Sequence, residues 1–149
     1  MTFIWERLAI GDLEDLKRPQ NEIGFILNVA EEVDVNPRKV VAMNHRKGVA
    51  YHKIPLKDGA PIPAEKMREA IQVIRQHIGS EKVLVACHYG VGRSASILMG
   101  YLCSAGMGYE EAFNLVSSKR PRVEPLPGLP ETIRETLHNV EEVQRCISP

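Results

Sequence analysis

Seven consecutive residues, 87–93, combine a thiol, two glycines and a fixed positive charge in the order Cys-His-Tyr-Gly-Val-Gly-Arg. The segment joins an apolar run to a helical pattern, so loop amides and the positive end of a helix dipole point at one place. Gly90 and Gly92 can adopt positive φ and carry no Cβ, which lets the loop surround a tetrahedral anion. The predicted phosphate-binding residues are His88, Tyr89, Gly90, Val91, Gly92 and Arg93.

Cys87 and Arg93 would give this anion site its chemistry. Arg93 stays protonated near neutral pH and offers a planar fork of donors to two phosphate oxygens. Cys87 would lie at the floor of the site, where the field that attracts an anion also favours the thiolate. A thiolate that faces a bound phosphate implies phosphoryl transfer to sulfur. The competing interpretation is an inert buried cysteine in an ordinary strand-to-helix turn.

Asp58 is the best candidate for the general acid that such a transfer needs, because the leaving oxygen must gain a proton as its bond to phosphorus breaks. Among the other aspartates, Asp12 is typical of a helix start. Asp58 follows a strand in a loop rich in Gly and Pro, from which a carboxyl group can reach over a pocket at strand ends. Two alternatives stay open: Asp58 is a turn residue of an Asp-Gly pair, or a glutamate elsewhere supplies the proton.

Apolar runs alternate with helical patterns along the chain. The runs predict strands over residues 22–30, 48–56 and 82–87, of which the first and third are apolar enough to be covered on both faces. The helical patterns predict helices over residues 63–78, 94–105, 109–119 and 131–146, with a left-handed cap at Gly79 and a proline-forced bend over 120–130. This alternation predicts an α/β fold with a central, mostly parallel, twisted sheet flanked by helices.

Length and composition favour one domain that spans residues 1–149, since 149 residues with 44% hydrophobic content can form one core. Nineteen basic and nineteen acidic residues cancel, which argues against nucleic acid or a membrane surface as the partner. The three cysteines lack the spacing of disulfide frameworks or zinc sites, and Cys103 and Cys146 are interpreted as packing or surface residues. We expect a cytoplasmic monomer without metal or cofactor.

Cys87, five intervening residues, Arg93 and Ser94 resemble the Cys-x5-Arg-Ser/Thr signature of the cysteine-dependent protein phosphatases. Other segments resemble the small, atypical dual-specificity phosphatases: WERLAIGDLEDL, ILNVAEE, IPLKDGAPIP and KRPRVEP. The resemblance implies a phosphatase-like fold, with Cys87 as nucleophile, Arg93 as clamp on the phosphate oxygens, Ser94 as the hydroxyl that steadies the thiolate and Asp58 as general acid. The implied substrates are proteins or peptides that carry phosphotyrosine, and also phosphoserine or phosphothreonine, hydrolysed through a cysteinyl-phosphate.

The sequence departs from this family at two positions. Ala86 stands where the family usually has a histidine, and Thr132 is the closest match to a glutamine that helps to orient water. Two roles stay open for His88 and Tyr89, which either contact substrate or cover the rim. The charged turn around residues 44–48, with His45, Arg46 and Lys47, is expected to be solvated.

Three other functions remain as alternatives to a protein phosphatase. They are a phosphatase of RNA 5′ ends or phosphoinositides, a non-catalytic phosphate-binding module, and a rhodanese-like sulfur transferase.

Overall fold

The computed structural model describes residues 1–35 and 49–147, with side chains as far as residue 138. The predicted turn at His45, Arg46 and Lys47 lies outside the described residues. Within them, one sheet has the strand order β1-β2-β5-β3-β4. The strands are β1 (Thr2–Trp5), β2 (Leu8–Gly11), β3 (Ile23–Ala30), β4 (Ala50–Leu56) and β5 (Lys82–Ala86). β1 pairs antiparallel with β2 and the other pairings are parallel, which confirms the predicted mostly parallel sheet.

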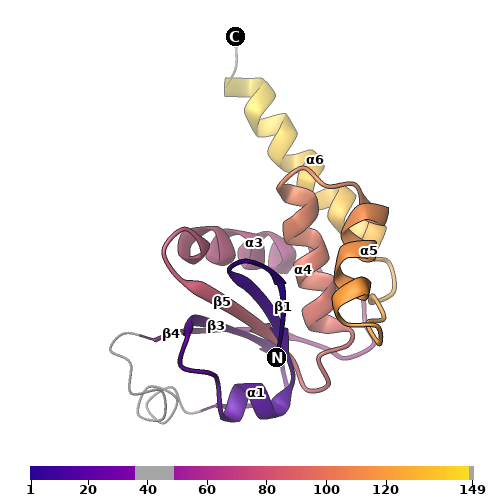
Figure 1. Cartoon of the computed structure of the whole chain (residues 1–149). Helices are drawn as coiled ribbons and strands as arrows, with labels where there is room; N and C mark the ends of the chain where they lie inside the picture. The colour runs from indigo at the N-terminus through magenta and orange to yellow at the C-terminus, as the bar shows by residue number, and fades with distance from the viewer. Residues whose placement is uncertain (36–48, 148–149) are drawn as a thin grey trace.

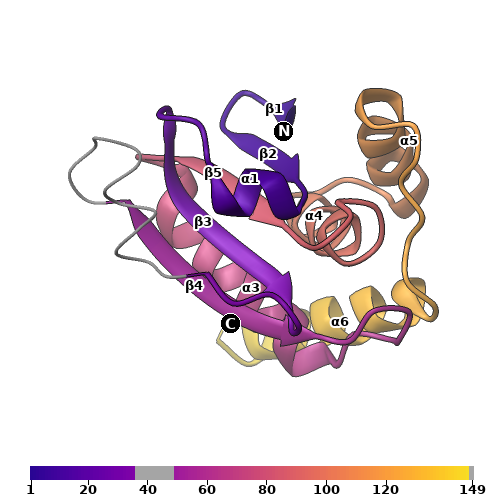
Figure 2. The same ribbon diagram turned by 90° about the horizontal axis from the view of Figure 1, so that it is seen from below.

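The two most apolar strands lie in the interior of the sheet, as their sequences predict. All eight residues of β3 are buried, and so are the last four of β5. Helix α1 (Leu13–Lys17) covers one face, and α3 (Ala64–Ile78) and α4 (Arg93–Ser104) cover the other, as Figures 1 and 2 show. The apolar runs are therefore buried on both sides, which is why their sequences show no alternation of polar and apolar residues.

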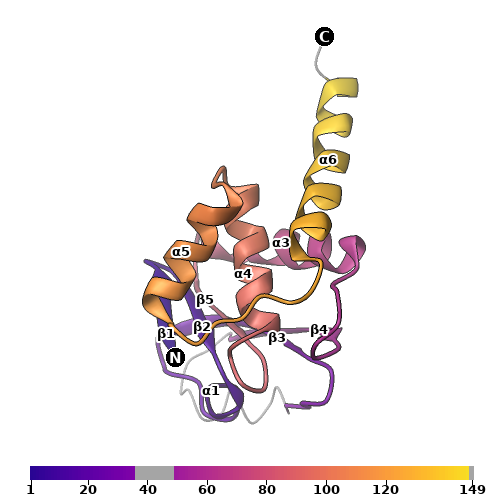
Figure 3. The same cartoon turned by 90° about the vertical axis from the view of Figure 1, so that its right-hand side faces the viewer.

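Two further helices complete the layer around α3 and α4. Helix α5 (Tyr109–Lys119) packs against α4, and α6 (Leu129–Ile147) packs against α3 and then extends away from the body of the molecule (Figure 3). Of the five apolar residues at helical spacing in α3 that predict its core face, Met67, Ala70, Ile71 and Ile74 are buried, and Ile78 is only half-buried. No helix within the described residues is long and apolar enough to cross a membrane.

Gly79 does not form the left-handed cap that its position after α3 suggests. Its φ is −70°, in the right-handed region. The backbone N–H groups of Ser80 and Glu81 instead both donate to the carbonyl of His77, at 3.1 Å and 2.8 Å. The helix thus ends in a tight right-handed turn that any residue could adopt. Gly106, after α4, does have positive φ, at 112°.

The parallel strands end at the same edge of the sheet, and candidate functional residues follow three of them. Glu32 lies two residues beyond β3, Asp58 two residues beyond β4, and Cys87 directly beyond β5. Open parallel sheets bind ligands outside the carboxyl ends of their strands, because helix N-termini and loops converge there. The topology therefore gathers side chains that are far apart in the sequence.

Gly11, the last residue of β2, provides a test of how tightly this edge is packed. A Cβ at this position would lie 2.8 Å from Asp15 Oδ2 and 2.9 Å from Leu84 Cδ1. We expect Gly11→Ala to lower the free energy of unfolding by about 1–3 kcal/mol, measured by urea denaturation. The control is Gly79→Ala, where the added Cβ has no neighbour within 4 Å and φ is already −70°, so stability should be unchanged or slightly higher. Equal stability of both variants would contradict the packing described here.

Candidate active site

Residues 87–93, called the phosphate loop below, connect β5 to α4, and Gly92 is the N-cap residue of that helix. The Cys87 side chain is buried at 2% exposure. Its Sγ accepts a hydrogen bond from the backbone N–H of Gly90 at 3.3 Å and lies 3.1 Å from Ser94 Oγ. A thiolate at this position would therefore face two donors and the N-terminus of α4, which all favour negative charge.

Both the backbone conformation at position 90 and the atoms around it require a glycine there. Its φ is +67°, in the left-handed region, and a Cβ would come within 2.5 Å of Arg120 Nη2 and 2.8 Å of the carbonyl oxygen of Gly11. Gly92 has φ of −106°, so only the first of the two loop glycines uses the positive φ that the sequence allows for both. The curl of the loop therefore depends on Gly90.

Arg93, the first residue of α4, is buried at 1% exposure, and most of its N–H groups are engaged by protein oxygens. Nη1 and Nη2 donate to the two carboxylate oxygens of Glu32 at 2.6 Å and 2.5 Å, and Nη1 also donates to the carbonyl of Leu56 at 3.1 Å. Nε is buried and has no hydrogen-bond partner among the described residues. The remaining donors, on Nε and Nη2, form the side fork of the guanidinium, whose geometry matches two phosphate oxygens.

Glu32 is the functional residue that sequence reasoning missed. The hydrogen bonds from Arg93 lower the pKa of the Glu32 carboxyl to about 2, although partial burial acts in the opposite direction. The same pairing raises the pKa of Arg93. Glu32 Oε1 also lies 3.6 Å from Nδ1 of His88. Glu32 thus holds the Nη1/Nη2 edge of the guanidinium, which fixes the direction of the adjacent Nε/Nη2 edge that carries the free donors.

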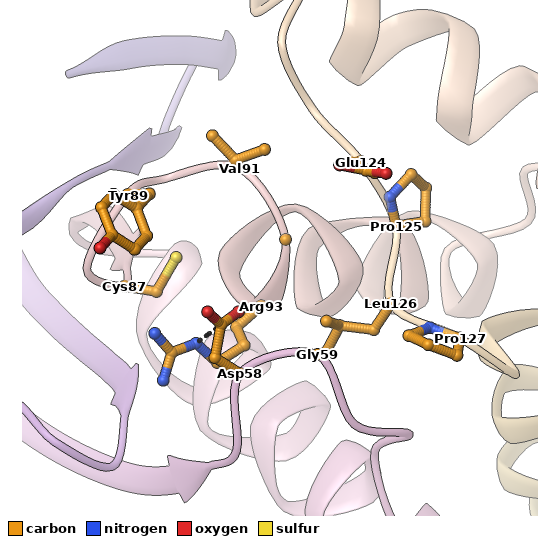
Figure 4. Close-up of a pocket in the computed structure, with 11 residues that line it drawn as sticks. Asp58, Gly59, Cys87, Tyr89, Val91, Arg93, Glu124, Pro125, Leu126 and Pro127 are labelled. Atoms are coloured by element: carbon orange, nitrogen blue, oxygen red, sulfur yellow. Dashed lines mark ion pairs between the residues drawn. The ribbon is translucent and has the colours of Figure 1, made fainter.

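A cavity of about 620 Å³ opens above the phosphate loop (Figure 4). Cys87 and Arg93 lie at its base, and Asp58 enters from the loop after β4 with its Oδ1 4.0 Å from Arg93 Nε. Asp58 is 64% exposed, so its carboxyl group is in contact with solvent while it faces the cavity. The other lining residues are Gly59, Tyr89, Val91, Gly92, Glu124, Pro125, Leu126 and Pro127.

The proline-rich segment after α5 bends as predicted and forms the wall of the cavity opposite Tyr89. Its backbone is fixed to the phosphate loop, because the N–H of Glu124 donates to the carbonyl of Val91 at 2.9 Å. Ser96 adds a second link: its hydroxyl donates to the carbonyl of Gly92 at 2.8 Å and accepts from the N–H of Leu126 at 2.9 Å. This wall is therefore held in place by α4 itself.

The structure brings most of the predicted site residues to one place and leaves a few elsewhere. The predicted residues that line the cavity are Cys87, Arg93, Asp58, Tyr89, Val91 and Gly92. Ser94 and Gly90 do not line it, but both contact the Cys87 thiol, Ser94 through Oγ and Gly90 through its backbone N–H. His88 is not among the lining residues; its ring stacks on that of Tyr89 at 4.4 Å between centroids.

The two positions that depart from the family pattern both lie outside the cavity. Ala86 is fully buried in β5, between Gly11 of β2 and Asn28 of β3. The Thr132 hydroxyl donates to the carbonyl of Ile62 at 2.8 Å, and Thr132 is not among the residues that line the cavity. Among the described residues, no group of three or more His, Cys, Asp and Glu side chains could hold a metal ion.

The parallel sheet, the cysteine loop after β5 and the arginine that begins α4 define a member of the cysteine-dependent protein tyrosine phosphatase superfamily. Residues 12–139 match the family model described as the catalytic domain of dual specificity phosphatases. The chain belongs to this family.

Individual relatives agree with this assignment. Mouse dual specificity protein phosphatase 15 is 25% identical over 142 residues, which cover 91% of this chain and 57% of the relative. The chain thus spans a little over half the length of that relative. The structure of human DUSP28 superposes with a TM-score of 0.78 at 19% identity and covers 95% of this chain and 99% of the other. The structure of PTPMT1 in complex with PI(5)P gives a TM-score of 0.74 at 15% identity, with 95% and 96% covered. At these identities the two structures show the fold alone.

The role assigned to Glu32 can be tested with a matched pair of variants. We expect Glu32→Gln to lower kcat/KM for p-nitrophenyl phosphate roughly 10²-fold, because the Arg93 fork loses its fixed orientation. The control is Glu31→Gln, which removes the neighbouring charge; the Glu31 carboxylate has no hydrogen bond or ion pair among the described residues. Wild-type activity in Glu32→Gln would show that Arg93 is oriented by other contacts.

The lowered pKa of Glu32 predicts that the stability of the protein depends on pH. The hydrogen bonds from Arg93 lower the pKa of the Glu32 carboxyl from its ordinary value of 4.5 to about 2 in the folded protein, so its ionic contribution to stability is present above pH 4.5. That contribution is lost as the pH falls towards 2, where the folded carboxylate gains a proton. The difference in unfolding free energy between wild type and Glu32→Gln should therefore narrow over this range in urea titrations. A constant difference would contradict the lowered pKa.

Proposed function

We propose that residues 1–149 form one catalytic domain that hydrolyses phosphotyrosine in proteins, with phosphoserine and phosphothreonine as further substrates. The observation that carries this proposal is the convergence of the Cys87 thiol, the free donor fork of Arg93 and the Asp58 carboxyl on one cavity. Each group has a distinct task in the transfer of a phosphoryl group to sulfur and then to water. A cytoplasmic location for this activity remains a prediction from the sequence.

In the first step the Cys87 thiolate attacks phosphorus, and the bond between phosphorus and the leaving oxygen breaks. The loop amides and the Arg93 fork hold the remaining phosphate oxygens, where charge develops in the transition state. Asp58, in its protonated form, gives its proton to the leaving oxygen, so the product is a neutral phenol or alcohol. The enzyme is left as a cysteinyl-phosphate with an ionised Asp58.

In the second step a water molecule attacks the cysteinyl-phosphate from the side on which the alcohol departed. The Asp58 carboxylate accepts a proton from this water, and the sulfur leaves as a thiolate. Ser94 Oγ, 3.1 Å from Sγ, and the Gly90 N–H, 3.3 Å from it, stabilise that leaving thiolate. Inorganic phosphate is released, and Asp58 is protonated again for the next cycle.

The walls of the cavity support an aromatic phosphate ester as the preferred substrate. Tyr89 and Val91 lie on one side of the thiol, and Pro125, Leu126 and Pro127 lie on the other (Figure 4). A phenyl ring between such walls loses contact with water and packs on apolar surface, whereas a serine side chain is too short to do so. We therefore expect kcat/KM to be higher for phosphotyrosine peptides than for matched phosphoserine peptides.

The alternatives have weaker support. The PTPMT1 structure, whose fold this chain shares, holds PI(5)P, so a phosphoinositide substrate is a second candidate for the same chemistry. A non-catalytic binding module would not need the thiol and the acid that both face the cavity here. A sulfur transferase is disfavoured by the family match over residues 12–139. A panel of phosphopeptides, phosphoinositides and 5′-phosphorylated RNA with the purified protein separates the substrate classes.

Replacement of the proposed nucleophile tests the chemistry directly. We expect Cys87→Ser to abolish hydrolysis of p-nitrophenyl phosphate while phosphate and tungstate still bind, because the loop amides and Arg93 are unchanged. Rates measured with that substrate and calorimetric titration with tungstate provide the two readouts. Turnover near the wild-type rate would rule out a cysteinyl-phosphate.

The role of Asp58 predicts a dependence on the leaving group. Nitrophenol departs without much protonation, whereas the tyrosine phenol needs a proton. We expect Asp58→Asn to lower kcat mildly for p-nitrophenyl phosphate and roughly 10²-fold or more for a phosphotyrosine peptide. Comparable losses on both substrates would point to impaired binding or folding, and a far-UV circular dichroism melt would distinguish these.

A further inference from the structure

Lys53, on the edge strand β4, contacts the short loop after β3 that carries Glu32. Its Nζ donates to the carbonyl of Glu31 at 3.1 Å and to the carbonyl of Val33 at 2.8 Å. It also pairs with the Asp34 carboxylate at 2.7 Å. One ammonium group therefore binds the loop at three points, and the two carbonyls that it holds flank Glu32.

These contacts matter because the direction of the Glu32 side chain depends on the two peptide groups that adjoin it. The peptide group before Glu32 is held through the carbonyl of Glu31 by Lys53. The peptide group after Glu32 is held through the N–H of Val33, which donates to the carbonyl of Ala30 at 3.2 Å. Since each peptide group is planar, fixing both of them fixes the backbone torsions of Glu32. Lys53 thus supplies one of the two constraints.

An irregularity in the strand pairing places Lys53 beside this loop. Asn28 of β3 is the register partner of Lys53, whereas Ala30 is the partner of Leu56, so two steps along β3 correspond to three along β4. Such bulges redirect side chains and are frequent beside active sites. Asn28 is fully buried, and its Nδ2 also donates to the Val33 carbonyl, at 2.8 Å. Asn28 and Lys53 therefore anchor the loop from neighbouring positions on two strands.

A simpler explanation treats Lys53 as a surface lysine with an ion pair. Asp34 is 94% exposed, and an ion pair with so exposed a carboxylate contributes little to stability. That explanation leaves out the carbonyls of Glu31 and Val33, which both accept from the same ammonium group. A lysine side chain that is only 24% exposed and donates to three oxygens is a fixed part of the loop.

We propose that Lys53 is a positioning residue for the reaction: it holds the backbone around Glu32, and Glu32 in turn orients the Arg93 guanidinium. Lys53 is not among the residues that line the Cys87 cavity, so its effect passes through Glu32. The inference rests on the proposed function, because the Arg93 fork must bind the phosphate of the substrate. Removing an outer contact of this kind typically lowers activity roughly 10–100-fold.

The test is a double-mutant cycle on kcat/KM for p-nitrophenyl phosphate. Lys53→Met keeps the apolar stem and removes the donors. We expect a loss of about tenfold, smaller than in Glu32→Gln because Asn28 still holds the Val33 carbonyl. In the Glu32→Gln background the same substitution should change kcat/KM less than about twofold, because the carboxylate that Lys53 positions is already gone. Lys53→Arg, which keeps the charge and the donors, should retain most of the activity.

The matched control is Lys82→Met, which removes another strand lysine that pairs with an exposed carboxylate, that of Glu22 at 3.0 Å. This pair lies at the opposite ends of the parallel strands, so kcat/KM should be unchanged. Urea denaturation establishes that each variant is folded under the assay conditions. Should Lys53→Met not fold, Lys53→Gln, whose amide still donates to one carbonyl, completes the same cycle with a smaller loss.

Tungstate binding separates this inference from the proposed function. In a Cys87→Ser background, calorimetric titration measures how well the phosphate loop and Arg93 hold an oxyanion without turnover. Lys53→Met should weaken tungstate binding about tenfold, and only while Glu32 is present. An unchanged kcat/KM in Lys53→Met, or the same factor of loss with and without Glu32, would overturn the inference. Failure of the wild type to hydrolyse any phosphate ester would count against the proposed function, while the tungstate affinities still decide the role of Lys53.

Discussion

The buried guanidinium of Arg93 is the constraint on which the rest of the site depends. A cation at 1% exposure is costly unless it is paired and hydrogen-bonded, and its partners here come from two separate strand ends. Glu32 follows β3, and the carbonyl of Leu56 ends β4. The donors that remain, on Nε and Nη2, belong to a side chain that lines the same cavity as Cys87. A shift of one residue in the pairing of β3 with β4 would move both partners, so the register of the parallel sheet determines how Arg93 is held at the end of the phosphate loop.

The ion pair between Glu32 and Arg93 limits which groups of the site can attract a phosphate. Glu32 already compensates the charge of Arg93, and a thiolate at Cys87 would add a negative charge next to an approaching phosphate dianion. Formal charges alone would therefore not favour binding. The backbone N–H groups of the phosphate loop and the N-terminus of α4 must supply the attraction, as they do where helices bind phosphate. The conformation of Gly90, which allows these amides to converge, is consequently as important as any charged side chain.

Features set by local sequence could be predicted, and features set by sheet register could not. Cys87 and Arg93 share one loop, so their spacing alone reveals an anion site, and the buried runs of β3 and β5 identify the interior strands. The general rule that loops after strands carry function predicts Asp58 at the cavity, and Asp58 does line it, while its role there remains a prediction. Glu31 and Glu32 look equivalent in the sequence, since only the pairing between strands determines which one faces Arg93. The left-handed cap expected at Gly79 was wrong because a right-handed turn ends α3.

The double hydrogen bond of Ser96 has a consequence for how this chain can vary. Its hydroxyl joins α4 to Leu126, so the polypeptide that leaves the helix returns to a point fixed by the helix itself. The intervening hairpin contains Gly106 and Gly108, around which an added Cβ would meet nothing within 4 Å. Insertions at this tip would lengthen the connection between α4 and α5 without moving Leu126, which Ser96 holds against α4. The hairpin is thus a natural attachment point for a fluorophore, an affinity tag or an inserted domain that leaves the phosphate loop undisturbed.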